Sequence, residues 1–124
     1  MEKLINCDII VDADCIEMIS GANQYFEVIF STKDKTKYKI IFDFVWDIRC
    51  SIESGYIDRA SKFLHNEKEK SSVLLIEDSE YVKYFENQVS GTRPVDCIQD
   101  YILFDSVDTV VEVLTIKKPI IVRM

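Results

Sequence analysis

Glycine and proline are scarce in this chain. Three Gly and two Pro occur among its 124 residues, which argues against flexible linkers, collagen-like repeats and extended disorder. No apolar run approaches the ~20 residues that a membrane-spanning helix needs. The first residues also lack the basic and apolar regions of a secretion signal, because Asp8, Asp12 and Asp14 interrupt them. We expect a single domain over residues 1–124 that is located in the cytoplasm and has no membrane partner.

Residues that ligate metals or act as nucleophiles are also few. The four cysteines are far apart and form no C-x-x-C pair, and His65 is the one histidine. A structural zinc site needs clustered Cys and His ligands, and thiols stay reduced inside cells. The sequence therefore predicts free thiols, no metal, no cofactor and no catalytic Cys–His pair.

Carboxylates are the remaining candidates for chemistry. Asp12 and Asp14 lie two residues apart, so on a strand they would share a face, as a pair of cation ligands does. A second group holds the acids that a carboxylate-dependent enzyme would need, namely Asp43, Asp47, Glu53 and Asp58. We interpret both groups as solvated or ion-paired side chains and predict that the protein is not an enzyme. A small carboxylate-dependent enzyme stays open as an alternative.

The first half of the chain has the two-residue alternation of β-strands with one solvated face. Apolar and polar side chains alternate in four segments separated by short polar turns, over residues 5–11, 15–20, 25–32 and 38–46. Short turns between alternating segments predict an antiparallel meander.

The second half mixes helical and strand patterns. Helices are expected over 56–64, over 79–89 and in a short segment that begins at Asp105, where Val107, Val110, Val111 and Leu114 follow helical spacing. Short strands are expected over 73–76 and 101–104, and Pro119 begins a final edge strand over 119–122. The predicted fold is α+β, a mainly antiparallel β-sheet with about three helices packed on one face.

Negative charge is concentrated in one stretch. Residues 77–112 hold nine acidic side chains and two basic ones, an excess of seven that equals the net charge of −7 of the whole chain. Aromatic side chains such as Tyr81, Tyr84 and Tyr101 lie among these acids. Such a composition predicts a surface that binds a basic protein. The phosphates of a nucleic acid would be repelled by it.

Several segments of this stretch resemble small bacterial immunity proteins. These proteins protect a cell from the toxin domains of contact-dependent growth inhibition and related polymorphic toxin systems. The resemblance spans roughly residues 40 to 115. It is carried by Ser79–Glu86, Ser90–Pro94, Tyr101–Asp105 and Asp108–Leu114, and the earlier Phe44–Arg49 and Tyr56–Arg59 look like part of the same pattern.

The resemblance implies a partner and a mechanism. The partner would be the C-terminal domain of a cognate toxin, in many such systems a nuclease with a basic cleft, and the immunity protein would occlude that cleft. Acidic side chains would pair with Lys or Arg of the cleft, and Tyr84 would anchor the complex. The candidate contact residues are Glu77, Asp78, Glu80, Tyr84, Asp105, Asp108 and Glu112. A regulatory or structural module that forms a homodimer through the edge strand at 119–122 is the other alternative.

Overall fold

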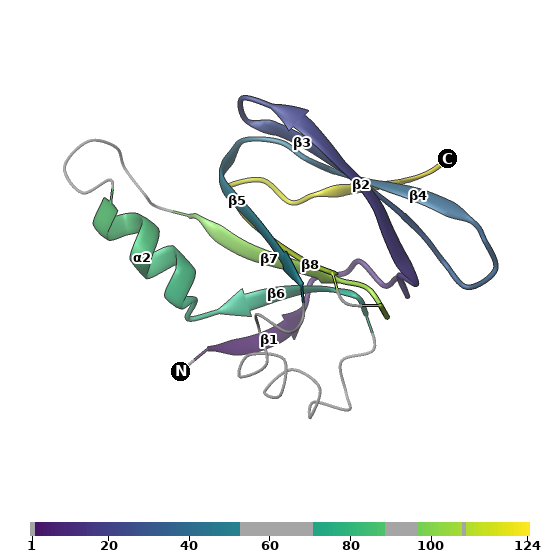
Figure 1. Ribbon diagram of the computed structural model, residues 1–124. Helices are drawn as coiled ribbons and strands as arrows, with labels where there is room; N and C mark the ends of the chain where they lie inside the picture. Colours follow the sequence, from purple (N-terminus) through teal and green to yellow (C-terminus); the bar gives the residue numbers. More distant parts are fainter. Residues whose placement is uncertain (1, 53–70, 89–96, 108) are drawn as a thin grey trace.

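A computed structural model describes residues 2–52, 71–88, 97–107 and 109–124. These residues form two antiparallel β-sheets packed face to face, and one helix lies beside the larger sheet (Figure 1). Sheet A has the strand order β1-β6-β7-β8-β5, and sheet B has the order β2-β3-β4-β9. The elements are β1 (Lys3–Asn6), β2 (Cys15–Ala22), β3 (Tyr25–Ser31), β4 (Lys37–Phe42), β5 (Val45–Ile52), β6 (Val73–Glu77), α2 (Glu80–Gln88), β7 (Gln99–Phe104), β8 (Thr109–Thr115) and β9 (Ile120–Arg123).

Sheet B contains the predicted meander of β2, β3 and β4. The turn between β3 and β4 is closed by a hydrogen bond of 2.9 Å from the Thr32 amide to the Thr36 carbonyl. The Asp34 carboxylate accepts from the Thr32 hydroxyl and from the Thr36 amide, and these bonds lower the pKa of Asp34 to about 2. This turn chemistry fixes the register of the hairpin, in which Val28 lies opposite Ile40.

The apolar segment predicted over 38–46 is two strands rather than one. Phe44 adopts a left-handed backbone conformation with φ of 54°, so the chain turns sharply between β4 and β5. The amide of Val45 then donates to the carbonyl of Gln24 at 2.9 Å. At this corner the chain passes from sheet B to sheet A, which is how two sheets replace the single predicted sheet.

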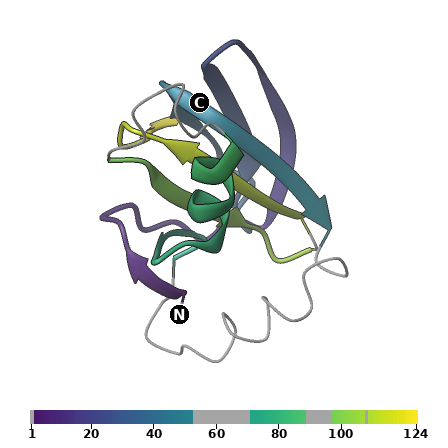
Figure 2. The same ribbon diagram turned by 90° about the vertical axis from the view of Figure 1, so that its left-hand side faces the viewer.

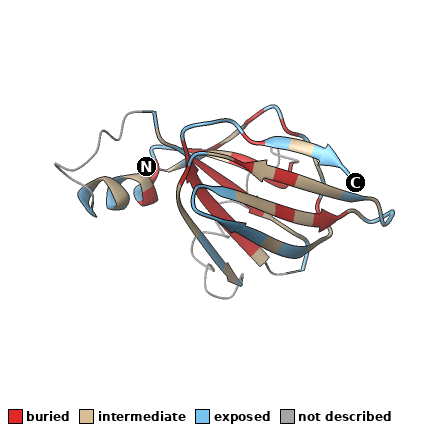
Figure 3. Cartoon of the chain, turned by 90° about the horizontal axis from the view of Figure 1, so that it is seen from above, coloured by how far each residue is buried: buried red, intermediate tan, exposed pale blue. Residues whose placement is uncertain are grey.

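The main core lies between the two sheets. Sheet B contributes Val28, Phe30, Ile40 and Phe42, and sheet A contributes Val73, Leu103, Val111 and Val113, all at most 1% exposed. A second cluster covers the other face of sheet A and consists of Leu4, Leu74, Ile76, Ile102 and Val110. The central strands of sheet A are therefore buried on both faces (Figure 3). Double burial explains why β6, β7 and β8 are nearly continuous apolar runs.

The predicted α+β fold with about three helices is wrong. The helix predicted over 79–89 is confirmed as α2, and the helix predicted over 56–64 lies outside the described residues. The helix predicted from Asp105 is the strand β8. Its valines favour a strand because they are β-branched, and Asp105 closes the turn from β7 to β8 by accepting from the amides of Val107 and Thr109.

Other predictions concern the thiols and the chain end. The four cysteines are free, as predicted, and β9 is an edge strand paired with β4. Within the described ranges, no helix is long and apolar enough to cross a membrane.

Asp105 gives a first prediction about stability. One of its carboxylate oxygens accepts from the Ile16 amide at 2.8 Å, and the other accepts from the Val107 and Thr109 amides. The Asp105→Ala variant leaves these amides without their acceptor, and we expect the free energy of unfolding to fall by about 2 kcal/mol. Urea denaturation measures this loss. The control Asp12→Ala removes an exposed acid and should change it by less than about 0.5 kcal/mol; equal losses would contradict the structural role of Asp105.

Candidate functional site

The exposed acids of the 77–112 stretch gather where β6 meets α2. Glu77 ends β6, Asp78 forms the turn, and Glu80 begins the helix; all three are exposed. One turn of helix later, Tyr84 is 63% exposed, a large fraction for an aromatic side chain. We call these four residues the α2 surface. They are four of the seven predicted contact residues, and one continuous segment of chain brings them together.

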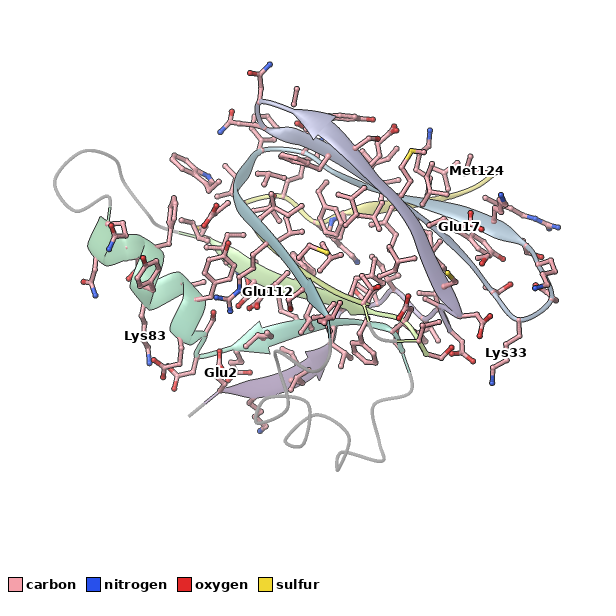
Figure 4. The ribbon with its side chains drawn as sticks, in the orientation of Figure 1. Glu2, Glu17, Lys33, Lys83, Glu112 and Met124 are labelled. Carbon is pink, nitrogen blue, oxygen red and sulfur yellow. The ribbon has the colours of Figure 1, made fainter. Side chains whose placement is uncertain are left out.

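The start of α2 is firmly built. Ser79 caps the helix, with its hydroxyl oxygen 3.0 Å from the amide of Val82. The Glu2 carboxylate accepts from the Glu80 amide at 3.0 Å, so Glu2 and the helix start lie close together (Figure 4). Acidic side chains are favourable here because the unpaired amides of a helix start carry a partial positive charge. The acids of the α2 surface are thus compatible with the helix that carries them.

Lys83 lies among the acids of the α2 surface. Its ammonium is 2.8 Å from a carboxylate oxygen of Asp78 and 3.7 Å from one of Glu80. The hydrogen bond from Lys83 is the largest cause that lowers the pKa of Asp78, to about 2. Asp78 therefore stays ionised at neutral pH, while Lys83 offsets part of the negative charge of this surface.

The other three predicted contact residues do not join the α2 surface. Asp105 lies at the opposite end of sheet A, because β6 and β7 are antiparallel and Ile76 pairs with Asp100 near one end of β7, while Asp105 follows its other end. Glu112 is 0% exposed, so it cannot contact a partner of the folded protein. Asp108 lies outside the described residues. The acidic stretch is therefore divided between surface and interior.

A partly buried group of polar side chains lies between sheet A and α2, and we call it the Arg49 cluster. The guanidinium of Arg49 on β5 donates to one oxygen of Glu112 on β8, at 3.1 Å from Nε and 2.8 Å from Nη2. The same guanidinium carbon lies 3.9 Å above the ring of Tyr81 on α2. Tyr81 is 4% exposed, and burial, together with a hydrogen bond to Asp47, raises the pKa of its phenol. These contacts join α2 to two strands of sheet A.

Two further contacts hold the helix in place. The Ser79 hydroxyl donates to the carboxylate of Asp100, which is 0% exposed. The rings of Trp46 and Phe85 meet edge to face, with centroids 6.2 Å apart. In Figure 2, α2 lies in front of sheet A, which carries Trp46 and Asp100. The position of the α2 surface thus depends on polar contacts as well as on apolar burial.

The sequence prediction missed the Arg49 cluster. Glu112 stands within Val110-Val111-Glu112-Val113-Leu114, and a strand this apolar is buried on both faces. An acid inside such a strand needs a basic partner, because an unpaired buried charge is costly. The sequence therefore indicates a basic partner for Glu112, but only when residues 109–115 are assigned as a strand rather than as a helix. Within the described ranges, no group of three or more His, Cys, Asp or Glu side chains is placed to hold a metal ion.

The Arg49 cluster gives a second prediction. The Glu112→Gln variant keeps the shape of the side chain but removes the buried negative charge from Arg49. We expect it to lower the free energy of unfolding by about 2 kcal/mol, less than for a fully buried pair, because the Arg49 side chain is 42% exposed. Urea denaturation measures the change.

A double variant serves as the control for this prediction. Arg49→Met combined with Glu112→Leu removes both charges and leaves neither one unpaired. We expect it to recover most of the lost stability, because apolar side chains of similar volume often replace a buried ion pair without cost. A double variant less stable than Glu112→Gln would contradict the assignment of an ion pair whose members depend on each other.

No family model, no curated protein and no solved structure matches the chain.

Proposed function

We propose that this protein is an immunity protein that binds and neutralises a cognate toxin domain in the cytoplasm. The observation that carries the proposal is the α2 surface, where three exposed acids and an exposed Tyr lie together around the junction of β6 and the anchored helix. The resemblance of residues 40–115 to immunity proteins of contact-dependent growth inhibition supports the same conclusion. The partner is the C-terminal domain of the toxin, and its active-site cleft is basic.

Inhibition proceeds by occlusion of that cleft. The carboxylates of Glu77, Asp78 and Glu80 occupy positions that phosphates of a nucleic-acid substrate would take, and they pair with Lys or Arg of the toxin. Tyr84 provides an apolar anchor with a polar tip, as the aromatic hot spots of protein interfaces do. The acids accelerate encounter with the basic cleft, and Tyr84 slows dissociation.

Rigidity is a further argument for this surface. Ser79, Tyr81 and Phe85 attach α2 to sheet A, so the helix is held in position before a partner arrives. A preordered surface loses less conformational entropy on binding than a flexible one. This favours α2 as the place of contact.

The enzyme alternative gains no support from the described residues. Asp47 accepts from Tyr81, and Asp43 accepts from the amide of Phe44, so both carboxylates already serve local structure. Asp58 lies outside the described residues. We therefore do not propose a second function.

The proposal predicts that Tyr84→Ala weakens binding to the toxin domain by about tenfold or more, through faster dissociation. The probe is a purified basic C-terminal toxin domain encoded beside this protein, and surface plasmon resonance measures both rate constants. The toxin regains activity in the presence of this variant. Unchanged dissociation with Tyr84→Ala would remove Tyr84 from the interface.

A charge reversal tests the acidic part of the surface. We expect Glu80→Lys to slow association about tenfold at low salt, with a smaller effect as ionic strength rises. The matched control is Asp12→Lys, which makes the same charge change near Ser72 and Ser106, at the other end of sheet A. If both variants slow association equally, overall charge rather than the α2 surface steers the encounter. If the wild-type protein fails to bind the toxin, the proposed function is wrong.

A further inference from the structure

The face of sheet B that points away from sheet A is unusually apolar. Cross-strand pairing places Met18, Ile29, Lys39 and Val122 in one row and Ser20, Glu27, Ile41 and Ile120 in the next. Met18 is 55%, Ile120 53% and Val122 40% exposed. Outward faces of antiparallel sheets are normally polar, and within the described residues no element covers this face (Figures 1 and 3). An exposed apolar surface of this kind marks a contact site.

Four side chains at the centre of this face form a square with a regular pattern. Ile29 pairs directly with Lys39, and Glu27 pairs directly with Ile41. The two isoleucines therefore lie on one diagonal and the two charges on the other. The Lys39 ammonium is 3.3 Å from a carboxylate oxygen of Glu27, and the Tyr25 hydroxyl donates to that same oxygen at 2.9 Å. The charged side chains are only 29% and 25% exposed, so they are held in place.

We propose that a second copy of this chain packs on this face, related by a twofold axis along the Ile29–Ile41 diagonal. Rotation about this axis places each isoleucine opposite its own counterpart. The same rotation exchanges the two charges, so Lys39 meets Glu27 of the partner subunit, and Glu27 meets Lys39 of the partner subunit. The contact is self-complementary, as a twofold interface requires. Met18, Ile120 and Val122 surround the charged centre with apolar contacts.

Charge complementarity selects a second copy over another partner. The chain carries a net charge of −7, so two copies repel each other over most of their surfaces. On this face, however, Lys39 balances Glu27, and Lys37 balances Glu17, whose carboxylate is 3.2 Å from the Lys37 ammonium. A purely acidic or purely basic partner would match only half of these charges. A second copy in this orientation places Lys39 opposite Glu27 on both sides of the axis.

The dimer leaves the α2 surface free. Sheet A separates α2 from sheet B (Figure 1), so the helices of a dimer joined through sheet B lie on its two outer sides. In Figure 4, Lys83 of α2 is far from Glu17 of β2 and from Lys33 in the turn between β3 and β4. The dimer also differs from pairing through the edge strand β9, because it uses side chains of the face rather than backbone groups of an edge.

Charge reversals test the proposal, with sedimentation velocity as the measurement of mass. The wild-type protein should sediment as a dimer. Lys39→Glu alone and Glu27→Lys alone should each weaken the dimer by at least about tenfold, because each places like charges opposite each other. An equimolar mixture of the two variants should form a heterodimer, because one chain then presents two acids and the other presents two lysines.

Matched controls separate this contact from overall charge and from unfolding. Lys33→Glu and Glu77→Lys make the same charge changes outside the square and should leave the dimer unchanged. Circular dichroism and thermal unfolding establish that each variant is folded. A wild-type protein that stays monomeric at every concentration overturns the proposal, and so does a dimer that withstands both single reversals. Two reversed variants that are monomeric alone and remain so when mixed also overturn it. None of these measurements involves a toxin, so the proposed function is tested separately.

Discussion

The ion pair between Arg49 and Glu112 is the contact on which the proposed site depends. A carboxylate that is 0% exposed is tolerated only when a basic group compensates for its lost hydration. This requirement places β5 beside β8 with Arg49 opposite Glu112. It also fixes α2, because the ring of Tyr81 covers the guanidinium. A helix of nine residues has little stability by itself in water, so its position is set by such contacts.

The acids of the 77–112 stretch serve two different purposes. Asp100, Asp105 and Glu112 satisfy hydroxyl, amide and guanidinium donors inside the fold. The exposed acids of the α2 surface do not have that role, and they are the ones available to a basic partner. A surplus of charge along the chain is thus not the same as a charged face. Pairing with Lys83 reduces the negative charge of the α2 surface further, so Tyr84 contributes more to the proposed complex than charge alone would suggest.

The two proposed contact surfaces lie on opposite sides of the molecule. The helix side presents charge and one aromatic anchor, whereas the outer face of sheet B presents isoleucines around a balanced ion pair. Together the two proposals describe one dimer that carries two α2 surfaces and binds two toxin domains. Such an arrangement raises apparent affinity only when the toxin domains are themselves linked.

The sequence by itself determined the meander of β2, β3 and β4, because two-residue alternation and short polar turns leave few other arrangements. It also determined α2, since Ser79 precedes an amphipathic segment as a helix cap. The structure of β8 was not predictable in this way, because Val107, Val110, Val111 and Leu114 fit both a helix and a strand buried on two faces. Only packing between layers decides which faces are buried. The burial of Glu112 likewise depends on Arg49, 63 residues away, and local patterns carry no information about contacts at that separation.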